Sequence, residues 1–232
     1  MGYLKTLTVP LLVLAAAGAN AAGQDAVEKI DHGVIVRPAD ATAADVKVEA
    51  VAPGILRVMA DPDGDFARTP SLMRAKTGAP PAVKVGEAGG HVTVSTQGIS
   101  AKVDARTGQV SFFDAAGKPL LAERARTFTP AKVEGKDYYA IRQRFESPDD
   151  EAFYGTGLHQ QGWMNLKGRD VELLQHNIDK AIPYLVSTRH YGILWDSNAI
   201  TRYGDPRGLQ PLGASLDLFD AQGKPGALTA RY

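Results

Sequence analysis

The sequence predicts an all-β protein built as a β-sandwich. From Gly33 onward, apolar and polar residues alternate with a period of two, which is the pattern of strands with one buried face. Turns rich in glycine and proline interrupt these runs at short intervals, as in sandwiches and barrels. No stretch carries a sustained apolar stripe at helical spacing. Because these observations agree, we expect strands throughout the chain.

The first strands are marked by apolar pairs that lie on one face of an extended chain. These pairs are Val34 and Val36, Val46 and Val48, Ile55 and Met59, Val83 and Val85, and Val92 and Val94. Turn sequences separate them, because proline restricts φ and glycine permits positive φ. The turns are Ala52-Pro53-Gly54, Asp61-Pro62-Asp63-Gly64, Ala79-Pro80-Pro81 and Gly89-Gly90.

The sequence in the middle of the chain predicts a meander of antiparallel strands. Residues 98–121 contain three apolar runs joined by turns at Thr107-Gly108 and Ala116-Gly117. Further strands are expected at 124–133 and 137–145.

Beyond Asp196 the pattern predicts strands at 215–219 and 227–232. The sequence stops within the last of these strands, and an interrupted strand would leave an unpaired sheet edge. We therefore expect the chain to be the front part of a longer protein.

The first 21 residues have the organisation of a secretory signal peptide. Lys5 precedes an apolar run from Leu7 to Ala19, and Ala19-Asn20-Ala21 is a small-x-small cleavage site. The alternative is a membrane anchor, but the run is much shorter than the roughly 20 residues that span a bilayer. We expect residues 22–232 to form one domain that is secreted or periplasmic and does not span a membrane.

Composition excludes several functions. Lys and Arg together number 26, as do Asp and Glu, so no basic field attracts nucleic acid. The chain has no cysteine, which excludes disulfides and thiol chemistry. His159, His176 and His190 are 17 and 14 positions apart, a spacing that imposes no metal geometry. We expect neither a metal nor a cofactor.

Motifs of common catalytic sites also fail to appear. Asp149, Asp150 and Glu151 are adjacent, so on an extended chain they point to opposite faces and fit a solvated turn better than an acid/base pair. The glycines at 155–157 are followed by Leu158-His159 and not by the Lys-Ser/Thr of a phosphate loop. No serine stands in a Gly-x-Ser-x-Gly elbow.

Polar residues that suit a neutral ligand gather between Phe153 and Asp196. Amide, imidazole and carboxylate groups offer the donors and acceptors that sugar hydroxyls need, beside a tryptophan able to stack on a sugar ring. The candidate sugar-binding residues are Trp163, Gln175, His176, Asn177 and Asp179. The alternative from residue types alone is an ordinary polar loop with a core tryptophan.

An ordered set of motifs resembles glycoside hydrolase family 31, which includes α-glucosidases and α-xylosidases. The resemblance runs from about Val46 to Phe219. It rests on the meander ending Asp-x-x-Gly-Lys-Pro-Leu-Leu at Leu121, on the Phe-Tyr-Gly-Thr-Gly of 153–157, and on Pro183-Tyr184 followed by Tyr191-Gly192. One departure is Leu158-His159, where many family members have glutamate after the second glycine.

This resemblance implies a galactose-mutarotase-like β-sandwich, or supersandwich, that precedes a (β/α)₈ barrel. In the family a loop of this domain helps to shape the sugar site, and residues 171–177 are similar to that loop. The two catalytic aspartates of the family lie on the barrel, so none of the catalytic residues is expected in this chain. The implied partners are that barrel and an oligosaccharide substrate, with an α-xylosidase acting on xyloglucan-type oligosaccharides as the implied enzyme. A free-standing carbohydrate-binding module and a purely structural sandwich remain alternatives.

Overall fold

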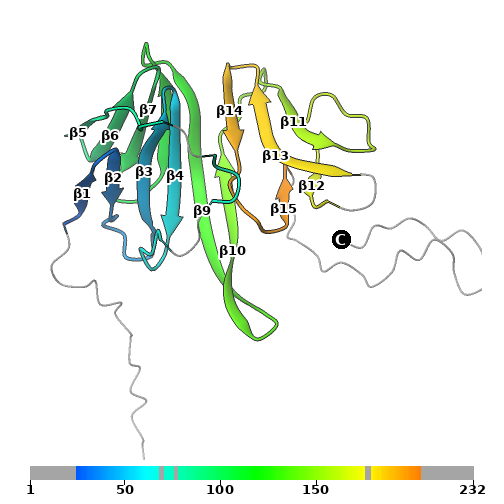
Figure 1. Cartoon of the computed structure of the whole chain (residues 1–232), viewed down its shortest axis with the longest axis horizontal. Helices are drawn as coiled ribbons and strands as arrows, with labels where there is room; N and C mark the ends of the chain where they lie inside the picture. Colours follow the sequence, from blue (N-terminus) through cyan, green and yellow to red (C-terminus); the bar gives the residue numbers. More distant parts are fainter. Residues whose placement is uncertain (1–24, 68–70, 76–77, 176–178, 205–232) are drawn as a thin grey trace, which may run out of the picture. The chain divides into compact units, whose positions relative to one another are not determined.

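A computed structural model describes residues 25–67, 71–75, 78–175 and 179–204. Its regular structure consists of fifteen β-strands, and the described residues contain no helix (Figure 1). The prediction of an all-β fold is confirmed for the described residues. The described residues form two compact units, one from residues 25–66 and 78–144 and the other from the remainder.

The first unit begins with a four-stranded antiparallel sheet. Its strands pair in chain order, so each pairs with its neighbour in sequence. They are β1 (Val27–Ile30), β2 (Gly33–Val36), β3 (Asp45–Ala52) and β4 (Ile55–Asp61). The apolar pairs predicted three of these strands, whereas β1 has no such pair and was not predicted.

A second sheet of the same unit has six strands in the order β10-β9-β8-β7-β6-β5. Their bounds are β5 (Lys84–Ala88), β6 (His91–Thr96), β7 (Ile99–Asp104), β8 (Val110–Asp114), β9 (Pro119–Val133) and β10 (Lys136–Phe145). The prediction of a separate strand at 124–133 was wrong, because these residues belong to β9, which runs unbroken through 15 residues. No glycine or proline turn stands between Leu121 and Arg124 to end it. In Figure 1, β9 and β10 form a long hairpin (green).

The two sheets of this unit share one core. Val34, Val36, Val46 and Val48 of the first sheet and Val92, Val94, Ala101, Val103 and Val110 of the second are at most 1% exposed and belong to one packed cluster. Burying a valine side chain contributes about 1.5–3 kcal/mol relative to leaving it exposed. The period-two alternation therefore supplies most of this core, and the sandwich prediction is confirmed for this unit.

The second unit contains a three-stranded sheet and a two-stranded ribbon. The sheet has the order β11-β13-β14 and the ribbon pairs β12 with β15. Their bounds are β11 (Phe153–Leu158), β12 (Val171–Leu173), β13 (Lys180–Ser187), β14 (Tyr191–Leu194) and β15 (Thr201–Tyr203). Residues 171–177 were expected to form a loop, but the first three of them form β12. A three-residue strand is too short to show a period in the sequence.

Tertiary contacts hold the ribbon in place. Arg202 on β15 forms an ion pair with Asp170, with Nη2 to Oδ2 at 2.7 Å and Nε to Oδ1 at 3.2 Å. The core of the unit consists of Phe153, Leu166, Val171 and Leu185, each less than 10% exposed, with Tyr191 and Tyr203 packed against it. Both ribbon strands therefore contribute to this small core.

Several predictions lie outside the described residues. They are the signal peptide at 1–21 and the strands at 215–219 and 227–232, and they stay predictions. Within the described part, no helix is long and apolar enough to cross a membrane.

Candidate functional site

A strained turn opens the site at the start of the second unit. Gly155, Thr156 and Gly157 have φ values of +119°, +63° and +105°. Positive φ is unfavourable for a β-branched residue such as threonine, yet Thr156 adopts it and is only 2% exposed. The register between β11 and β13 shifts at this point. Such strain persists only where the surroundings enforce it, and it clusters at functional sites.

Hydrogen bonds hold this turn. The Thr156 hydroxyl donates to the carbonyl of Gly155 at 2.7 Å, and His159 Nε2 lies 2.9 Å from the carbonyl oxygen of Thr156. Because a carbonyl only accepts, Nε2 must carry the proton in this contact. The other ring nitrogen, Nδ1, is then the acceptor in neutral His159.

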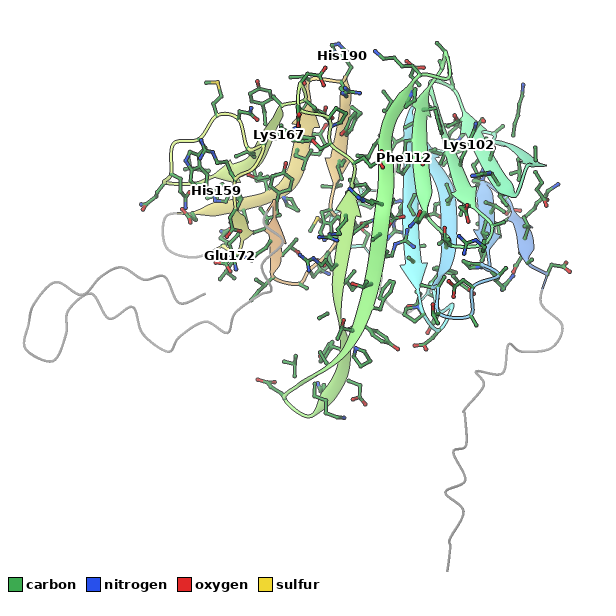
Figure 2. The ribbon with its side chains drawn as sticks, turned by 180° about the vertical axis from the view of Figure 1, so that it is seen from behind. Lys102, Phe112, His159, Lys167, Glu172 and His190 are labelled. Atoms are coloured by element: carbon green, nitrogen blue, oxygen red, sulfur yellow. The ribbon has the colours of Figure 1, made fainter. Side chains whose placement is uncertain are left out.

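A cavity of about 190 Å³ lies beside the turn. Its wall comes from β11, from the segment that follows β11, and from the first residue of β12. The lining residues are Gly155, Gly157, Leu158, His159, Gln161, Trp163, Leu166 and Val171. His159 is labelled in Figure 2. Leu166 and Val171 are each 4% exposed and join the cavity to the core.

Trp163 is the aromatic member of this lining and is 39% exposed. The guanidinium carbon of Arg169 lies 5.2 Å from the centre of its ring. A cation over an indole face contributes about 0.5–1 kcal/mol at an exposed position. This contact restrains the tryptophan, which lines the cavity.

The other predicted sugar-binding residues lie elsewhere in this unit. Gln175 is exposed and follows β12, while Asp179 precedes β13 and is partly buried. Neither residue lines the cavity. His176 and Asn177 lie outside the described residues. The structure therefore brings Trp163 together with His159 and Gln161 but does not place Gln175 or Asp179 with them.

Asp179 has an unusual environment. Its Oδ1 is buried and has no hydrogen-bond partner among the described residues. Buried carboxylate oxygens are normally satisfied by protein, water or ligand. This atom is therefore able to accept a hydrogen bond from a group that the described residues do not supply.

Glu151 corrects the interpretation of the acidic run. Asp149 and Asp150 are exposed in a turn, as predicted, but Glu151 is only 2% exposed. Its Oε1 accepts hydrogen bonds from the Ser187 hydroxyl at 2.5 Å and the Tyr191 hydroxyl at 2.6 Å. Its Oε2 is buried without a described partner. These hydroxyls lie 36 and 40 positions away, so only the tertiary fold brings them to Glu151.

Two tyrosines near this carboxylate have perturbed acidities. Burial, followed by the hydrogen bond to Glu151, raises the pKa of Tyr191 well above its usual value. Burial, with a smaller contribution from the negative charge of Glu151, raises the pKa of Tyr203 to about 12. Both effects disfavour the phenolate, because it would be a second anion in a poorly solvated place.

We expect Tyr203 to make the protein less stable in strong alkali. Its folded-state pKa is about 12, against a value of 10.0 for an unperturbed tyrosine. Between these values the unfolded chain has lost the proton that the folded chain retains, so the free energy of unfolding falls as pH rises. Below pH 10 this contribution is fully present.

Unfolding free energies measured from pH 9 to pH 12 check this expectation. Tyr203→Phe is the matched variant, because the Tyr203 hydroxyl makes no hydrogen bond to the described residues. The variant should lose less stability than the parent protein between pH 10 and pH 12. Equal losses in the two proteins would contradict the assignment.

The lining of the cavity consists of polar, aromatic and apolar groups. Within the described ranges no three His, Asp or Glu residues are placed to hold a metal ion. No carboxylate lines the cavity, while an imidazole, an amide and an indole do. His159 and Gln161 were not predicted as binding residues, because an isolated His or Gln after a strand carries no pattern of its own.

Comparison with known proteins identifies the family. The model of the glycosyl hydrolase 31 N-terminal galactose mutarotase-like domain matches residues 45–203. A protein from Pseudescherichia vulneris described as an uncharacterized family 31 glucosidase is 30% identical over 132 residues, which is 47% of this chain and 25% of that protein. An α-xylosidase from Saccharolobus solfataricus is 27% identical over 172 residues, covering 67% of this chain and 22% of the enzyme.

Solved structures agree with this assignment. The GH31 α-xylosidase from Xanthomonas citri is 58% identical with a TM-score of 0.76, covering 87% of this chain and 22% of the enzyme. A GH31 α-xylosidase from a soil metagenome, complexed with xylose, is 27% identical with a TM-score of 0.61, covering 76% of this chain and 28% of the enzyme. The chain thus spans about a quarter of the length of these relatives. From its sequence and its fold, the chain belongs to the family of glycosyl hydrolase 31 N-terminal galactose mutarotase-like domains.

Proposed function

We propose that this chain is the N-terminal β-sandwich part of an exported α-glycosidase, and that the enzyme is an α-xylosidase acting on xyloglucan-type oligosaccharides. The observation that carries the proposal is the 58% identity to the Xanthomonas citri α-xylosidase over 87% of the chain. Export is inferred from the apolar run and cleavage site at residues 7–21. The chain matches about a quarter of its relatives, so the rest of the enzyme is expected to follow it.

In this proposal the domain contributes to sugar binding and not to bond cleavage. The loop between β12 and β13 carries the polar residues Gln175, His176, Asn177 and Asp179. Asp179 supports a binding role, because its buried Oδ1 has no hydrogen-bond partner among the described residues. The acid and nucleophile of a glycosidase are a pair of carboxylates about 5–10 Å apart across the scissile bond. By resemblance, both are expected on the downstream barrel.

Expression of the complete reading frame tests the activity. The full-length protein should hydrolyse an aryl α-xyloside with a higher kcat/KM than the matching aryl α-glucoside, and residues 22–232 alone should hydrolyse neither. Preference for the glucoside would overturn the α-xylosidase assignment. The absence of hydrolysis by the full-length protein would overturn the enzyme proposal. Turnover by residues 22–232 above a matched blank would contradict the non-catalytic role.

The loop itself is tested by His176→Ala in the full-length protein. If the imidazole binds a substrate hydroxyl, its loss removes one neutral hydrogen bond, worth about 0.5–1.5 kcal/mol. That energy corresponds to a rise in KM of roughly two- to tenfold, with a smaller change in kcat, because the bond is made to bound sugar and not to the reacting atoms. Steady-state kinetics and a thermal melt on the same variant give both quantities.

His190→Asn is the matched control for this variant. His190 is exposed, lies at the other end of β13, and has a φ of +64°, which asparagine tolerates. It should leave KM unchanged. A lower melting temperature for His176→Ala with an unchanged kcat/KM would show that His176 is structural and would remove the loop from the sugar site.

A further inference from the structure

We propose that the cavity beside the 155–157 turn binds a single neutral pyranose ring, stacked on Trp163 and hydrogen-bonded by His159 and Gln161. This inference rests on the proposed function for the class of ligand, a carbohydrate. The residues and the size of the ligand come from the structure. None of the candidate loop residues from 175 to 179 is needed for it.

The size of the cavity suits one sugar ring. The cavity has a volume of about 190 Å³. This space is of the size of a single pyranose ring. Trp163 and Gln161 are both exposed, so a sugar unit can enter the cavity while its neighbours remain outside.

The hydrogen-bonding groups match sugar hydroxyls. His159 donates through Nε2 to the Thr156 carbonyl, so its Nδ1 is left as an acceptor. The Gln161 amide and the Trp163 indole N–H make no hydrogen bond to the described residues. Together these groups provide an acceptor, a donor and an amide that does both. A hydroxyl both donates and accepts, so this set suits a polyol.

The walls also match the shape of a pyranose. Sugar rings carry C–H groups on their faces and hydroxyls at their edges, and an indole face packs well against the C–H groups. Arg169 lies over the Trp163 ring, and Trp163 lines the cavity. Leu166 and Val171 provide an apolar floor. No carboxylate lines the cavity to attract a cation or a metal.

The strained turn at 155–157 forms part of the cavity wall. Three consecutive positive φ values place the backbone of Gly155 and Gly157 in the cavity wall. Buried Thr156 keeps this conformation through its hydrogen bonds to Gly155 and His159. Strain of this kind is maintained where it shapes a binding surface. The hydrogen bond to Thr156 also orients His159, which lines the cavity.

Hydrogen exchange read by peptide in the full-length protein tests the proposal. Xylose and glucose, added separately at millimolar to tens of millimolar concentrations, should slow exchange in the segment from Gly157 to Val171. Xylitol, which has no ring to stack, should have a much weaker effect. Glucuronate tests whether Arg169 selects an anion. Stronger protection by glucuronate than by glucose would overturn the assignment to a neutral ring.

Two variants make the test specific. Trp163→Ala should weaken the sugar affinity obtained from the protection curve by about tenfold or more, because the stacking surface is lost. Met164→Ala is the control, since Met164 is 80% exposed, is adjacent in sequence and does not line the cavity. It should leave the affinity unchanged. Equal weakening in both variants, or no protection of the segment by either sugar, would overturn the proposal.

The outcome is separable from that of the proposed function. Hydrolysis of an aryl α-xyloside without protection of residues 157–171 would reject the cavity and leave the enzyme assignment intact. Protection without hydrolysis would reject the enzyme assignment and leave the cavity as a sugar site.

Discussion

Replacing Gly157 by alanine is expected to lower the free energy of unfolding by about 3 kcal/mol or more. A Cβ at this position would overlap the carbonyl oxygen of Lys180 on β13 and crowd the backbone nitrogen of Ile182. The φ of +105° is also unfavourable for any residue with a Cβ. Because both obstacles are backbone, neither can move aside without breaking the pairing of β11 with β13.

Gly168→Ala separates the two causes. Gly168 also has a positive φ, +69°, but a Cβ there would meet no atom within 4 Å. It should cost only about 1 kcal/mol, from backbone strain alone. Thermal melts of both variants of the full-length protein measure the difference, and hydrogen exchange should show faster opening of β11 and β13 in Gly157→Ala. Equal losses of unfolding free energy in the two variants would mean that the overlap with the Lys180 carbonyl does not destabilise the protein.

Replacing Glu151 by alanine is expected to be the second severe change. It removes the acceptor of the Ser187 and Tyr191 hydroxyls and leaves a small void beside them. A buried donor without a partner costs about 1–3 kcal/mol, so we expect a total loss of about 2–4 kcal/mol. The loss of stability should be largest at the β13–β14 hairpin, because the Ser187 hydroxyl oxygen also accepts a hydrogen bond from the Arg189 backbone amide in the turn of that hairpin. Denaturant unfolding and peptide-resolved exchange measure it.

Two further variants show which property of Glu151 matters. Glu151→Gln keeps an oxygen that can accept from both hydroxyls but has no charge, so it should lose less than Glu151→Ala. Asp149→Ala is the surface control, since Asp149 is exposed and has no partner among the described residues. Its effect should stay within about 0.5 kcal/mol. A Glu151→Ala variant as stable as Asp149→Ala would show that the buried network contributes nothing.

Local patterns in the sequence determined most of the first unit. Alternation at Val34 and Val36, or at Val92 and Val94, reflects burial of one face of a single strand, and that burial is what the structure shows. The glycine turns at Gly108 and Gly117 were also predictable, because their positive φ is a local requirement. These features depend on residues within a few positions of each other, so the sequence alone contains them.

The arrangement of the residues at the candidate site depends on tertiary contacts. Glu151 is adjacent to two exposed aspartates, and nothing local distinguishes it from them; its burial depends on hydroxyls 36 and 40 positions further along. The strands β12 and β15 exist because 171–173 and 201–203 pair with each other across the chain. Trp163 was selected from its residue type, but its association with His159 and Gln161 around a cavity follows from the turn at 155–157. Period and composition describe one strand at a time, whereas these contacts join segments that are distant in sequence.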